Sequence, residues 1–448
     1  MPAIVTDVLR RKIARDFFDA FTAQTDLYYI GIGRAQKWDS SDIVPTPIDN
    51  PGEITRFQQS LQGVKKVSAT SLVVPRNNWS QGSYYAQYDD QTAGYGLTPY
   101  YVKTDNNQVY ICLETGRDAN GIAVPSVIEP QFSNNDSFRL ADGYVWKFIY
   151  TISAQNANDF MSSNFMPCQK QLQTDSNSTG IELKQEEIQD NSVAGEILSF
   201  IITNNGAGYT SPPTLTVTDV LGSGVQSVVT IDSATGTVAK IELRDSGTTQ
   251  IRGSGYSRPL VTLTGGGGAG ATARAVLGPD SGLGRDARED LKASGIMFFS
   301  KFQGTDSDFI VDQDFRQVGL IKDPLNPAGS AFTQTTGNSL KRMVLSNTIS
   351  TFTADKIIQG QTTLAEAYID EIDGSTIYYH QTNQTGFVPF LDGEQVQETN
   401  GSGDGIIDSA EILPEVEPTS GDVLYIDNRS PVERATAQAE DIKVIIQF

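Results

Sequence analysis

The start of the chain has the pattern of an amphipathic helix. Apolar residues recur at every fourth position between residues 5 and 21, and Arg10, Arg11, Arg15 and Asp16 lie on the other sides. These apolar residues are Val5, Leu9, Ile13, Phe17 and Phe21. Their spacing places them on one face of a helix, and Thr6 or Asp7 is suited to cap its N-terminus.

After residue 26 the hydrophobic pattern becomes that of β-strands. The clearest strand covers residues 144–152, which carry apolar residues on both faces, so we expect it to be buried on both sides or to lie at an interface. Residues 442–448 alternate in the same way and predict a C-terminal strand. Residues 39–53 are polar and contain three prolines, which predicts an exposed loop. Shorter strands are predicted at 27–33, 67–74 and 108–113.

Residues 195–278 contain an imperfect internal repeat. The first copy includes GAGYTSPPTLTV from Gly206, and the second includes GSGYSRPLVTL from Gly253. The offset between the copies is 47 at Tyr209 and Tyr256, and 46 beyond the prolines that follow them. An apolar run precedes each copy, so the region is predicted to be a small, pseudo-symmetric β domain.

Composition favours a mainly β protein. The 448 residues include 41 glycines and 19 prolines, and 38% are hydrophobic, which suits many short strands joined by turns around real cores. At about 100–200 residues per domain, this length allows two to four domains.

The charge of the chain argues against several classes of partner. Its formal net charge is −21, and its longest basic block is Arg10–Lys12, so binding to nucleic acid or to an anionic membrane is not expected. No apolar run approaches the roughly 18 residues that a membrane-spanning helix needs. Cys112 and Cys168 define no disulfide framework, and the N-terminal residues do not resemble a secretory signal.

The sequence does not favour an enzyme. His380 is the single histidine, and in its alternating strand pattern it is interpreted as a satisfied structural residue. The glycine run 265–270 lacks the Lys-Ser/Thr pair that completes a phosphate-binding loop. Two cysteines 56 positions apart (168 − 112) do not make a zinc site.

Residues 400–411 are compatible with a calcium-binding loop of the EF-hand type. Gly405 would supply the sharp turn, and oxygen ligands at this spacing suit a hard cation. The candidate ligands are Asn400, Ser402, Asp404, Ile406 (through its carbonyl), Asp408 and Glu411. Asn400 stands where an aspartate is expected, and the alternative interpretation is an acidic glycine turn.

Five segments resemble a family of phage structural proteins. They are YYIGIGRAQKWDS (28–40), VPRNNWSQGSYY (74–85), DGYVWKFIYTI (142–152), FRQVGLIKDPL (315–325) and GDVLYIDNRSPVERATAQAEDIKVIIQF (421–448). In this order they resemble the gene-product-eight family, the baseplate wedge proteins of T-even-type phages with contractile tails.

The resemblance implies a fold and a division of the chain. The fold is mainly β, with a two-layer, β-sandwich-like core, an N-terminal helix and two small inserted β domains. The core would comprise residues 1–170, 283–330 and 421–448. The inserts would be the β-repeat domain at 171–282 and a second β region, with the calcium loop, at 331–420.

The resemblance also implies a function without catalysis. The chain would be a virion structural protein of a myovirus, made in the bacterial cytoplasm and located in the tail baseplate. There it would form a homodimer and contact other wedge proteins during assembly and contraction. No catalytic residue, nucleic acid or membrane is expected, and no cofactor apart from the candidate calcium ion.

Four residues of the shared segments are candidates for interface contacts. Trp, Tyr and Arg dominate interface hot spots, and the candidates are Trp38, Trp79, Arg429 and Arg434. The alternatives are core-capping tryptophans and arginines in internal ion pairs. Beside these arginines, Asp427-Asn428 predicts a turn, and Pro431 is expected to end strand pairing.

Two alternative functions are compatible with the sequence. In a receptor- or glycan-binding tail protein, Tyr209 and Tyr256 of the repeat would form an aromatic platform for sugars. A tail-associated hydrolase would need carboxylates gathered in a cleft.

Overall fold

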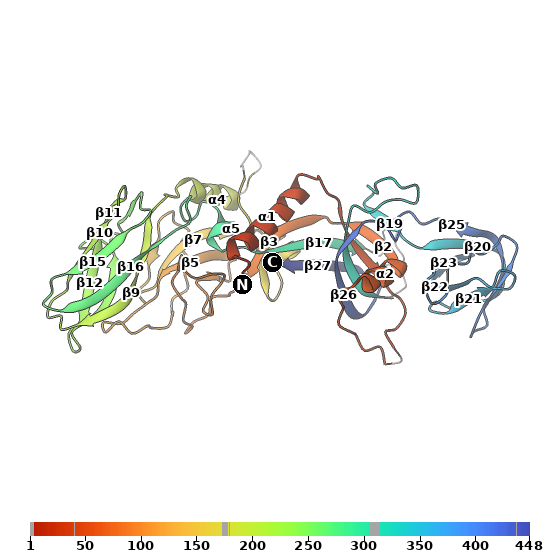
Figure 1. The fold of residues 1–448 in the computed structure, drawn as a ribbon, viewed down its shortest axis with the longest axis horizontal. Helices are drawn as coiled ribbons and strands as arrows, with labels where there is room; N and C mark the ends of the chain where they lie inside the picture. The colour runs from red at the N-terminus through yellow and green to blue at the C-terminus, as the bar shows by residue number, and fades with distance from the viewer. Residues whose placement is uncertain (1–3, 40, 173–177, 179, 304–313, 436) are drawn as a thin grey trace. The chain divides into compact units, whose positions relative to one another are not determined.

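A computed structural model describes residues 4–39, 41–172, 178, 180–303, 314–435 and 437–448 (Figure 1). Ser40 and residue 436 of the shared segments, and residues 304–313 of the expected core, lie outside the described residues. The chain divides into two compact units. Unit 1 contains residues 1–16, 71–297 and 446–448, and unit 2 contains residues 17–70 and 298–445.

The expectation of a mainly β protein is confirmed, since strands make up 42% and helices 11% of the chain. The predicted N-terminal helix is present, and Thr6 is its cap because its Oγ1 accepts the N–H of Leu9 at 3.3 Å. The helices are α1 (Asp7–Thr22), α2 (Pro51–Gln59), α3 (Ala154–Phe160), α4 (Gly180–Asp190) and α5 (Ala287–Asp290).

One correction concerns the proline-rich loop predicted at 39–53. Its last residues begin helix α2, because Asn50 caps the helix by accepting the N–H of Glu53 at 2.9 Å and Pro51 occupies the first turn. Pro51, the last proline of this segment, therefore begins a helix.

In unit 1, a four-stranded antiparallel sheet of order β4-β5-β7-β6 contributes residues to an aromatic core. Trp146 of β7 is fully buried there beside Tyr85 and Tyr144, so the prediction of a strand buried on both faces is confirmed. The bounds are β4 (Tyr101–Lys103), β5 (Gln108–Glu114), β6 (Phe138–Arg139) and β7 (Val145–Thr151). Strand β8 (Phe165–Cys168) pairs with β3 (Ala69–Pro75).

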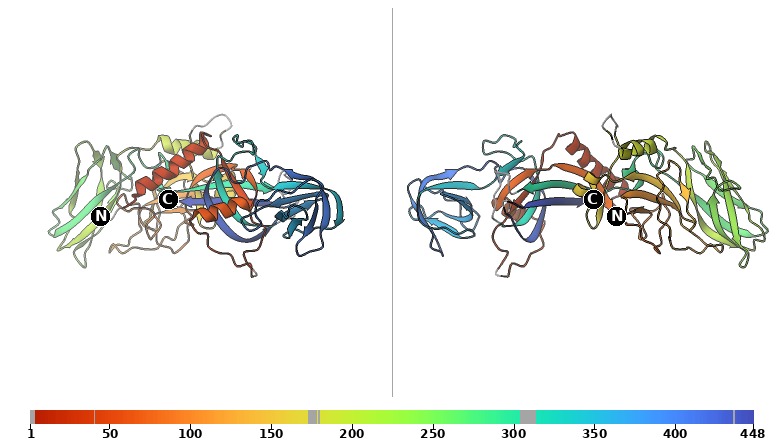
Figure 2. Two further views of the ribbon diagram at one scale, coloured as in Figure 1. Left: turned by 45° about the vertical axis from the view of Figure 1, so that its right-hand side comes forward. Right: turned by 180° about the vertical axis from the view of Figure 1, so that it is seen from behind.

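The repeat region of unit 1 consists of strands β9 to β16, which gather at one end of the unit in each view of Figures 1 and 2. The bounds are β9 (Ile197–Ala207), β10 (Thr214–Thr218), β11 (Ser223–Val225), β12 (Ser227–Asp232), β13 (Thr237–Leu243), β14 (Arg252–Ser254), β15 (Leu260–Thr264) and β16 (Ala269–Leu277). The first copy contains β9 to β12 and the second contains β13 to β16.

The two copies exchange strands. The first strand of copy one, β9, pairs with the last strand of copy two, β16, while β14 and β13 of copy two pair with β11 and β12 of copy one. The pairs are equivalent: Ala207 lies opposite Ala269 in one sheet, and the corresponding Ser254 lies opposite Ser223 in the other.

Strands β10 and β15 show where the pseudo-two-fold axis passes. They pair antiparallel, and Thr216 lies opposite Thr262, which is its own counterpart at the offset of 46. The tyrosines are also equivalent, because the hydroxyl of Tyr209 accepts the N–H of Ala271 at 3.3 Å and that of Tyr256 accepts the N–H of Val225 at 3.2 Å. The predicted internal symmetry is therefore present, and the two symmetric copies are interlocked by their exchanged strands.

Unit 2 contains a five-stranded antiparallel sheet of order β19-β2-β1-β18-β26. Phe57 of α2 packs on a pair of facing glycines, Gly31 and Gly319, where a Cβ at Gly319 would lie 2.4 Å from the Phe57 ring. The bounds are β1 (Tyr28–Gly33), β2 (Leu61–Lys66), β18 (Asp314–Lys322), β19 (Thr336–Asn338) and β26 (Asp422–Glu433). Strands β17 (Gly295–Gln303) and β27 (Ala439–Gln447) contain division points between the units, and β27 confirms the predicted C-terminal strand.

The predicted turn at Asp427-Asn428 is wrong. Strand β26 runs through these residues, since Asp427 lies opposite Val318 and Asn428 opposite Gln317. Pairing resumes beyond Pro431, where Val432 lies opposite Phe315, so the proline occupies a bulge.

Unit 2 also contains a closed six-stranded barrel of order β20-β23-β22-β21-β24-β25. Its strands lie within residues 331–420, the range expected for a second β region, although β19 from the same range belongs to the five-stranded sheet. The bounds are β20 (Lys341–Ser350), β21 (Ile357–Gly360), β22 (Glu366–Asp373), β23 (Thr376–His380), β24 (Gln395–Glu398) and β25 (Asp404–Ile412).

Candidate functional site

Two of the predicted interface residues meet at the edge of the five-stranded sheet. Trp38 follows β1, and its indole Nε1 donates a hydrogen bond to the backbone carbonyl of Arg429 at 3.0 Å. The guanidinium of Arg34 lies 4.2 Å from the centre of the Trp38 ring, within the range of a cation–π interaction. Burial lowers the pKa of Arg34. Trp38 is half-buried, so part of its ring is accessible.

The loop that carries Trp38 is anchored by a buried arginine. Arg316 of β18 is only 3% exposed and forms ion pairs with Asp42 at 3.0 Å and with Asp314 at 2.8 Å. The hydrogen bond from Arg316 holds the pKa of Asp42 below its ordinary value, and Asp42 also accepts the N–H of Trp38 at 3.0 Å. This side of the sheet is therefore rigidly built around a partly exposed tryptophan.

The other two interface candidates are directed into the protein. Arg434 is buried and pairs with Glu440 at 3.2 Å, so the internal ion pair weighed as an alternative is present. Trp79 packs against the aromatic core of unit 1, and its Nε1 donates to Ser126 Oγ at 3.1 Å. Arg429, by contrast, keeps a half-exposed side chain beside Asp427.

The predicted calcium loop is not formed. Asp404, Ile406, Asp408 and Glu411 belong to the extended strand β25, in which Asp404 and Glu411 are roughly 23 Å apart at about 3.3 Å per residue. The amides of Gln395 and Gln397 bind the carboxylate of Asp404.

The remaining candidate ligands do not restore a cation site. Asn400 and Ser402 precede the strand, and Glu411 pairs with Lys341 instead. In the described part of the chain, no group of three or more His, Cys, Asp or Glu side chains is placed to hold a metal ion. Pairing of β25 with β20 and β24 favours the extended backbone over a loop.

His380 is a satisfied structural residue, as interpreted. It lies buried in the barrel with Nδ1 2.5 Å from Asp370 Oδ2 and Nε2 3.0 Å from the amide of Gln36. Its ring stacks on Tyr368 at a centroid distance of 5.4 Å.

The proposed aromatic platform for sugars is also wrong. Tyr209 and Tyr256 are 4% and 5% exposed, and their rings fill the core of the repeat region. The glycines before each tyrosine allow this close packing, because a Cβ at Gly206 or Gly253 would lie 2.9 or 2.8 Å from the ring.

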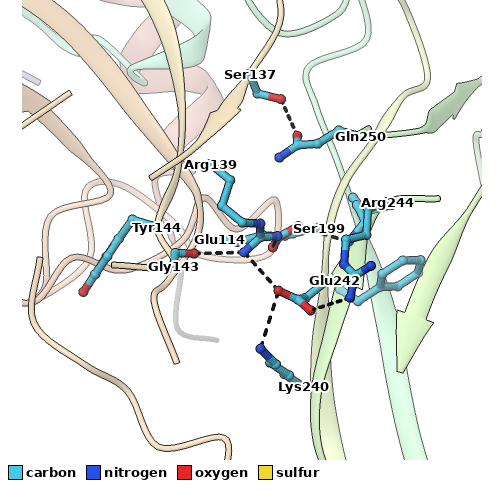
Figure 3. A network of polar contacts seen from close by, with 12 residues as sticks. Glu114, Ser137, Arg139, Gly143, Tyr144, Ser199, Lys240, Glu242, Arg244 and Gln250 are labelled. Atoms are coloured by element: carbon cyan, nitrogen blue, oxygen red, sulfur yellow. Dashed lines mark hydrogen bonds and ion pairs between the residues drawn. The ribbon is translucent and has the colours of Figure 1, made fainter. Parts of the chain in front are cut away.

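A cleft of about 980 Å³ in unit 1 gathers the residues that the sequence did not single out. It lies between loops of the β4-β5-β7-β6 sheet and strands β9 and β13 of the repeat region. Arg139 of β6 bridges the two sides: it pairs with Glu114 of β5 and, at 3.3 Å, with Glu242 of β13 (Figure 3). Glu242 also forms ion pairs with Lys240 at 3.6 Å and with Arg244 at 3.5 Å.

Further polar contacts strengthen the same junction. Glu114 accepts the backbone N–H of Leu243 at 3.2 Å. Arg252 donates to Ser137 at 2.8 Å and to the Leu198 carbonyl, and burial lowers the pKa of its guanidinium. Arg274 of β16 pairs with Asp89 at 2.6 Å. Burial alone would raise the pKa of Asp89, but the hydrogen bond from Arg274 keeps it low.

These contacts are of the kind that fixes one structural element to another. Most of the charges in the junction are paired, which suits a rigid attachment of the repeat region. No spacing in the sequence relates residues 114, 139 and 242, so only the fold could reveal them. In the described residues, no helix is long and apolar enough to cross a membrane.

The chain matches no protein-family model and no curated protein.

Proposed function

We propose that this chain is a structural subunit of the baseplate wedge of a contractile phage tail, without catalytic activity. The proposal rests on the sequence resemblance and on where the resembling segments lie in the fold.

The supporting observation is that three resembling segments are neighbours in one sheet. Residues 28–40, 315–325 and 421–448 supply β1, β18 and β26, which pair directly in that order. Another two segments, residues 74–85 and 142–152, contribute Trp79, Tyr85, Trp146 and others to the aromatic core of unit 1. Chance similarities scattered over the chain would have no reason to pack together.

The non-resembling stretches fit the same proposal. Strands β9 to β16 and the closed barrel lie within them. Under this proposal they are additions to a shared core, and they provide surface for contacts with neighbouring subunits in the assembled tail.

Electron microscopy of intact phage particles, labelled with antibody against the chain, tests the proposal. We expect label confined to the baseplate at the distal end of the tail. Label on fibre tips would favour receptor binding, and particles without label would contradict a structural role.

We further propose, from the same resemblance, that the chain forms a homodimer and contacts other wedge proteins. The half-exposed Trp38, with the exposed Arg429 beside it, is the candidate hot spot, because tryptophan and arginine dominate such contacts. Sedimentation equilibrium of the purified chain tests the dimer, and a concentration-independent monomer mass would contradict it.

Receptor or glycan binding is the second candidate function. The polar cleft of about 980 Å³ supports it in place of the buried tyrosines, because polar side chains such as Gln87, Asn205 and the exposed Arg117 line its walls. A glycan array probed with the full chain tests it. Binding that is lost in Arg117→Gln would support this candidate, and no bound glycan would remove it.

A further inference from the structure

The two ends of the repeat region share one backbone design but differ in their side chains. One end carries Val220, Leu221 and Leu260, which are 93%, 80% and 64% exposed. The counterparts of these residues at the other end, at the offset of 46, are Gly266, Gly267 and Thr214. Strand pairing confirms the two ends, since Leu260 lies opposite Thr218 and Thr214 opposite Thr264. The fold therefore does not require apolar residues at these positions.

A side-chain carboxylate holds the turn beside Val220 and Leu221, whereas a backbone carbonyl holds the equivalent turn at the other end. In copy two, the carbonyl of Gly266 accepts the N–H of Thr210 at 2.9 Å and of Ser211 at 3.3 Å. In copy one, the carboxylate of Asp219 accepts the equivalent N–H groups, of Ser257 at 3.2 Å and of Arg258 at 2.7 Å.

Asp219 also fixes the turn that displays the apolar pair. Its other oxygen accepts the N–H groups of Leu221 at 3.0 Å and Gly222 at 3.1 Å. These backbone hydrogen bonds hold the pKa of Asp219 far below its ordinary value, so it remains an acceptor at neutral pH. The exposed Val220 and Leu221 are thus held in place before any partner arrives, which lowers the entropy cost of binding.

We propose that Val220, Leu221, Leu260 and Arg258, here called the apolar knob, dock into a concave apolar pocket bordered by carboxylates on a different protein. Arg258 gives the charge preference: it is exposed, its guanidinium forms no ion pair with any described residue, and its counterpart in copy one is the neutral Ser211. Cation and apolar side chains are both absent from the matching end, so this end has been adapted for binding.

The small size of the knob favours a concave pocket as its binding site, and its charge favours a pocket on a different protein. A stable interface buries about 1,200 Å² or more in total, and four side chains packed against a flat surface fall short of that. A concave pocket surrounds a protruding group and gains more contact from it. Two knobs facing each other would also bring Arg258 against its own copy, which like-charge repulsion disfavours. The argument for docking uses only the side chains of the knob, whereas its test in infected cells rests on the proposed function of the chain as a phage protein.

Photo-cross-linking in infected cells tests the proposal on the full chain. A benzophenone amino acid replaces Leu260 in one variant and Thr214 in the other, so the control probe occupies the equivalent strand position at the opposite end. We expect position 260 to cross-link to one different protein, and position 214 to give at least about tenfold less of that product, since the matched end lacks the hot-spot residues. Leu221→Asp, added to the position-260 variant, is expected to reduce the product by roughly 30-fold.

Each other outcome overturns the proposal. A product that contains only a second copy of this chain would make the knob a self-contact. Equal products from positions 260 and 214, or a product unchanged by Leu221→Asp, would show that the knob has no docking role. The labelling of phage particles reports separately on the baseplate assignment, so the failure of one proposal is distinguishable from failure of the other.

Discussion

The indole N–H of Trp38 binds the backbone carbonyl of Arg429 at 3.0 Å, across a separation of 391 residues. The two residues come from the first and the last of the five segments that resemble baseplate wedge proteins. Their contact lies where β26 bulges at the edge of the five-stranded sheet. It covers a backbone acceptor on an edge strand, which otherwise is open to pairing with another chain.

Replacing Trp38 tests the energetic value of this contact. Trp38→Phe retains an aromatic ring beside Arg34 but removes the donor to the Arg429 carbonyl. We expect a loss of about 1 kcal/mol in the free energy of unfolding, which is the usual contribution of one such hydrogen bond. Urea denaturation of the full chain, followed by circular dichroism, measures it.

Arg429→Ala is the matched control because the hydrogen bond uses the backbone of Arg429. Its half-exposed ion pair with Asp427 contributes little, so the free energy of unfolding is expected to change by at most about 0.5 kcal/mol. If Arg429→Ala were as destabilising as Trp38→Phe, the side chain, and not the capped carbonyl, would be the important group.

Sequence periodicity predicted the elements better than it predicted their connections. The alternation in residues 144–152 identified β7 and its burial because a strand that packs on both faces leaves a local signature. The repeat predicted two copies. Copies whose strands pair only within each copy and copies that exchange strands would have the same sequence pattern. Only the pairing of β9 with β16 distinguishes them.

The errors arose where tertiary contacts override local preference. Asp427-Asn428 is a turn signal, yet Asn428 is held in β26 by its hydrogen bond from Gln317 at 2.9 Å. Residues 400–411 have calcium-loop spacing, but the neighbours of β25 in the barrel extend the backbone. The ion pairs of Arg139 with Glu114 and Glu242 join positions with no regular spacing, so no sequence pattern predicts them.

These ion pairs are expected to hold the repeat region on its sheet. Arg139→Met leaves Glu114, whose side chain is 9% exposed, without its arginine. A broken buried pair costs about 3–5 kcal/mol, and the partial exposure of Arg139 reduces our expectation to about 2 kcal/mol. Hydrogen exchange measured by mass spectrometry should show faster exchange in β9 and β13.

Arg285→Met is the control for a surface ion pair. Arg285 pairs with Asp190 at 3.0 Å with both side chains largely exposed, so its loss should cost at most about 1 kcal/mol. Unchanged exchange in β9 and β13 of the Arg139→Met variant would show that shape and apolar packing alone fix the repeat region.

Asp290 predicts a pH-dependent loss of stability. It is fully buried, and burial raises its pKa well above the ordinary value, as do Asp286 and Glu289, while Lys147 opposes the shift. Its Oδ2 accepts the N–H of Gly284 at 3.0 Å, an acceptor that an asparagine retains. Because the folded state binds the proton more tightly than the unfolded state does, stability falls as pH rises above the unfolded pKa of about 4, until the folded pKa is reached.

Asp290→Asn removes this titration. We expect the variant to match the wild type near pH 4 and to become more stable than it by about 1.4 kcal/mol per pH unit above that, up to the folded pKa. Melting temperatures of both proteins between pH 4 and pH 8 measure the difference. A pH-independent difference would mean that Asp290 keeps the same charge in the folded and unfolded chain.

The strand-exchanged symmetry of the repeat region predicts equal effects from two distant substitutions. Tyr209→Phe and Tyr256→Phe each remove a buried hydroxyl that accepts one backbone N–H, of Ala271 and Val225 respectively. Each should cost about 1–2 kcal/mol in the free energy of unfolding, since a buried donor is left without its partner. Urea denaturation of the two variants and of the double variant measures the effects.

Because the two tyrosines occupy equivalent positions in interlocked copies, loosening either one loosens strands of both, and the double variant should deviate from additivity. Strictly additive effects would show that the copies are energetically independent despite their exchanged strands, and a loss confined to one tyrosine would show that the symmetry is one of backbone only.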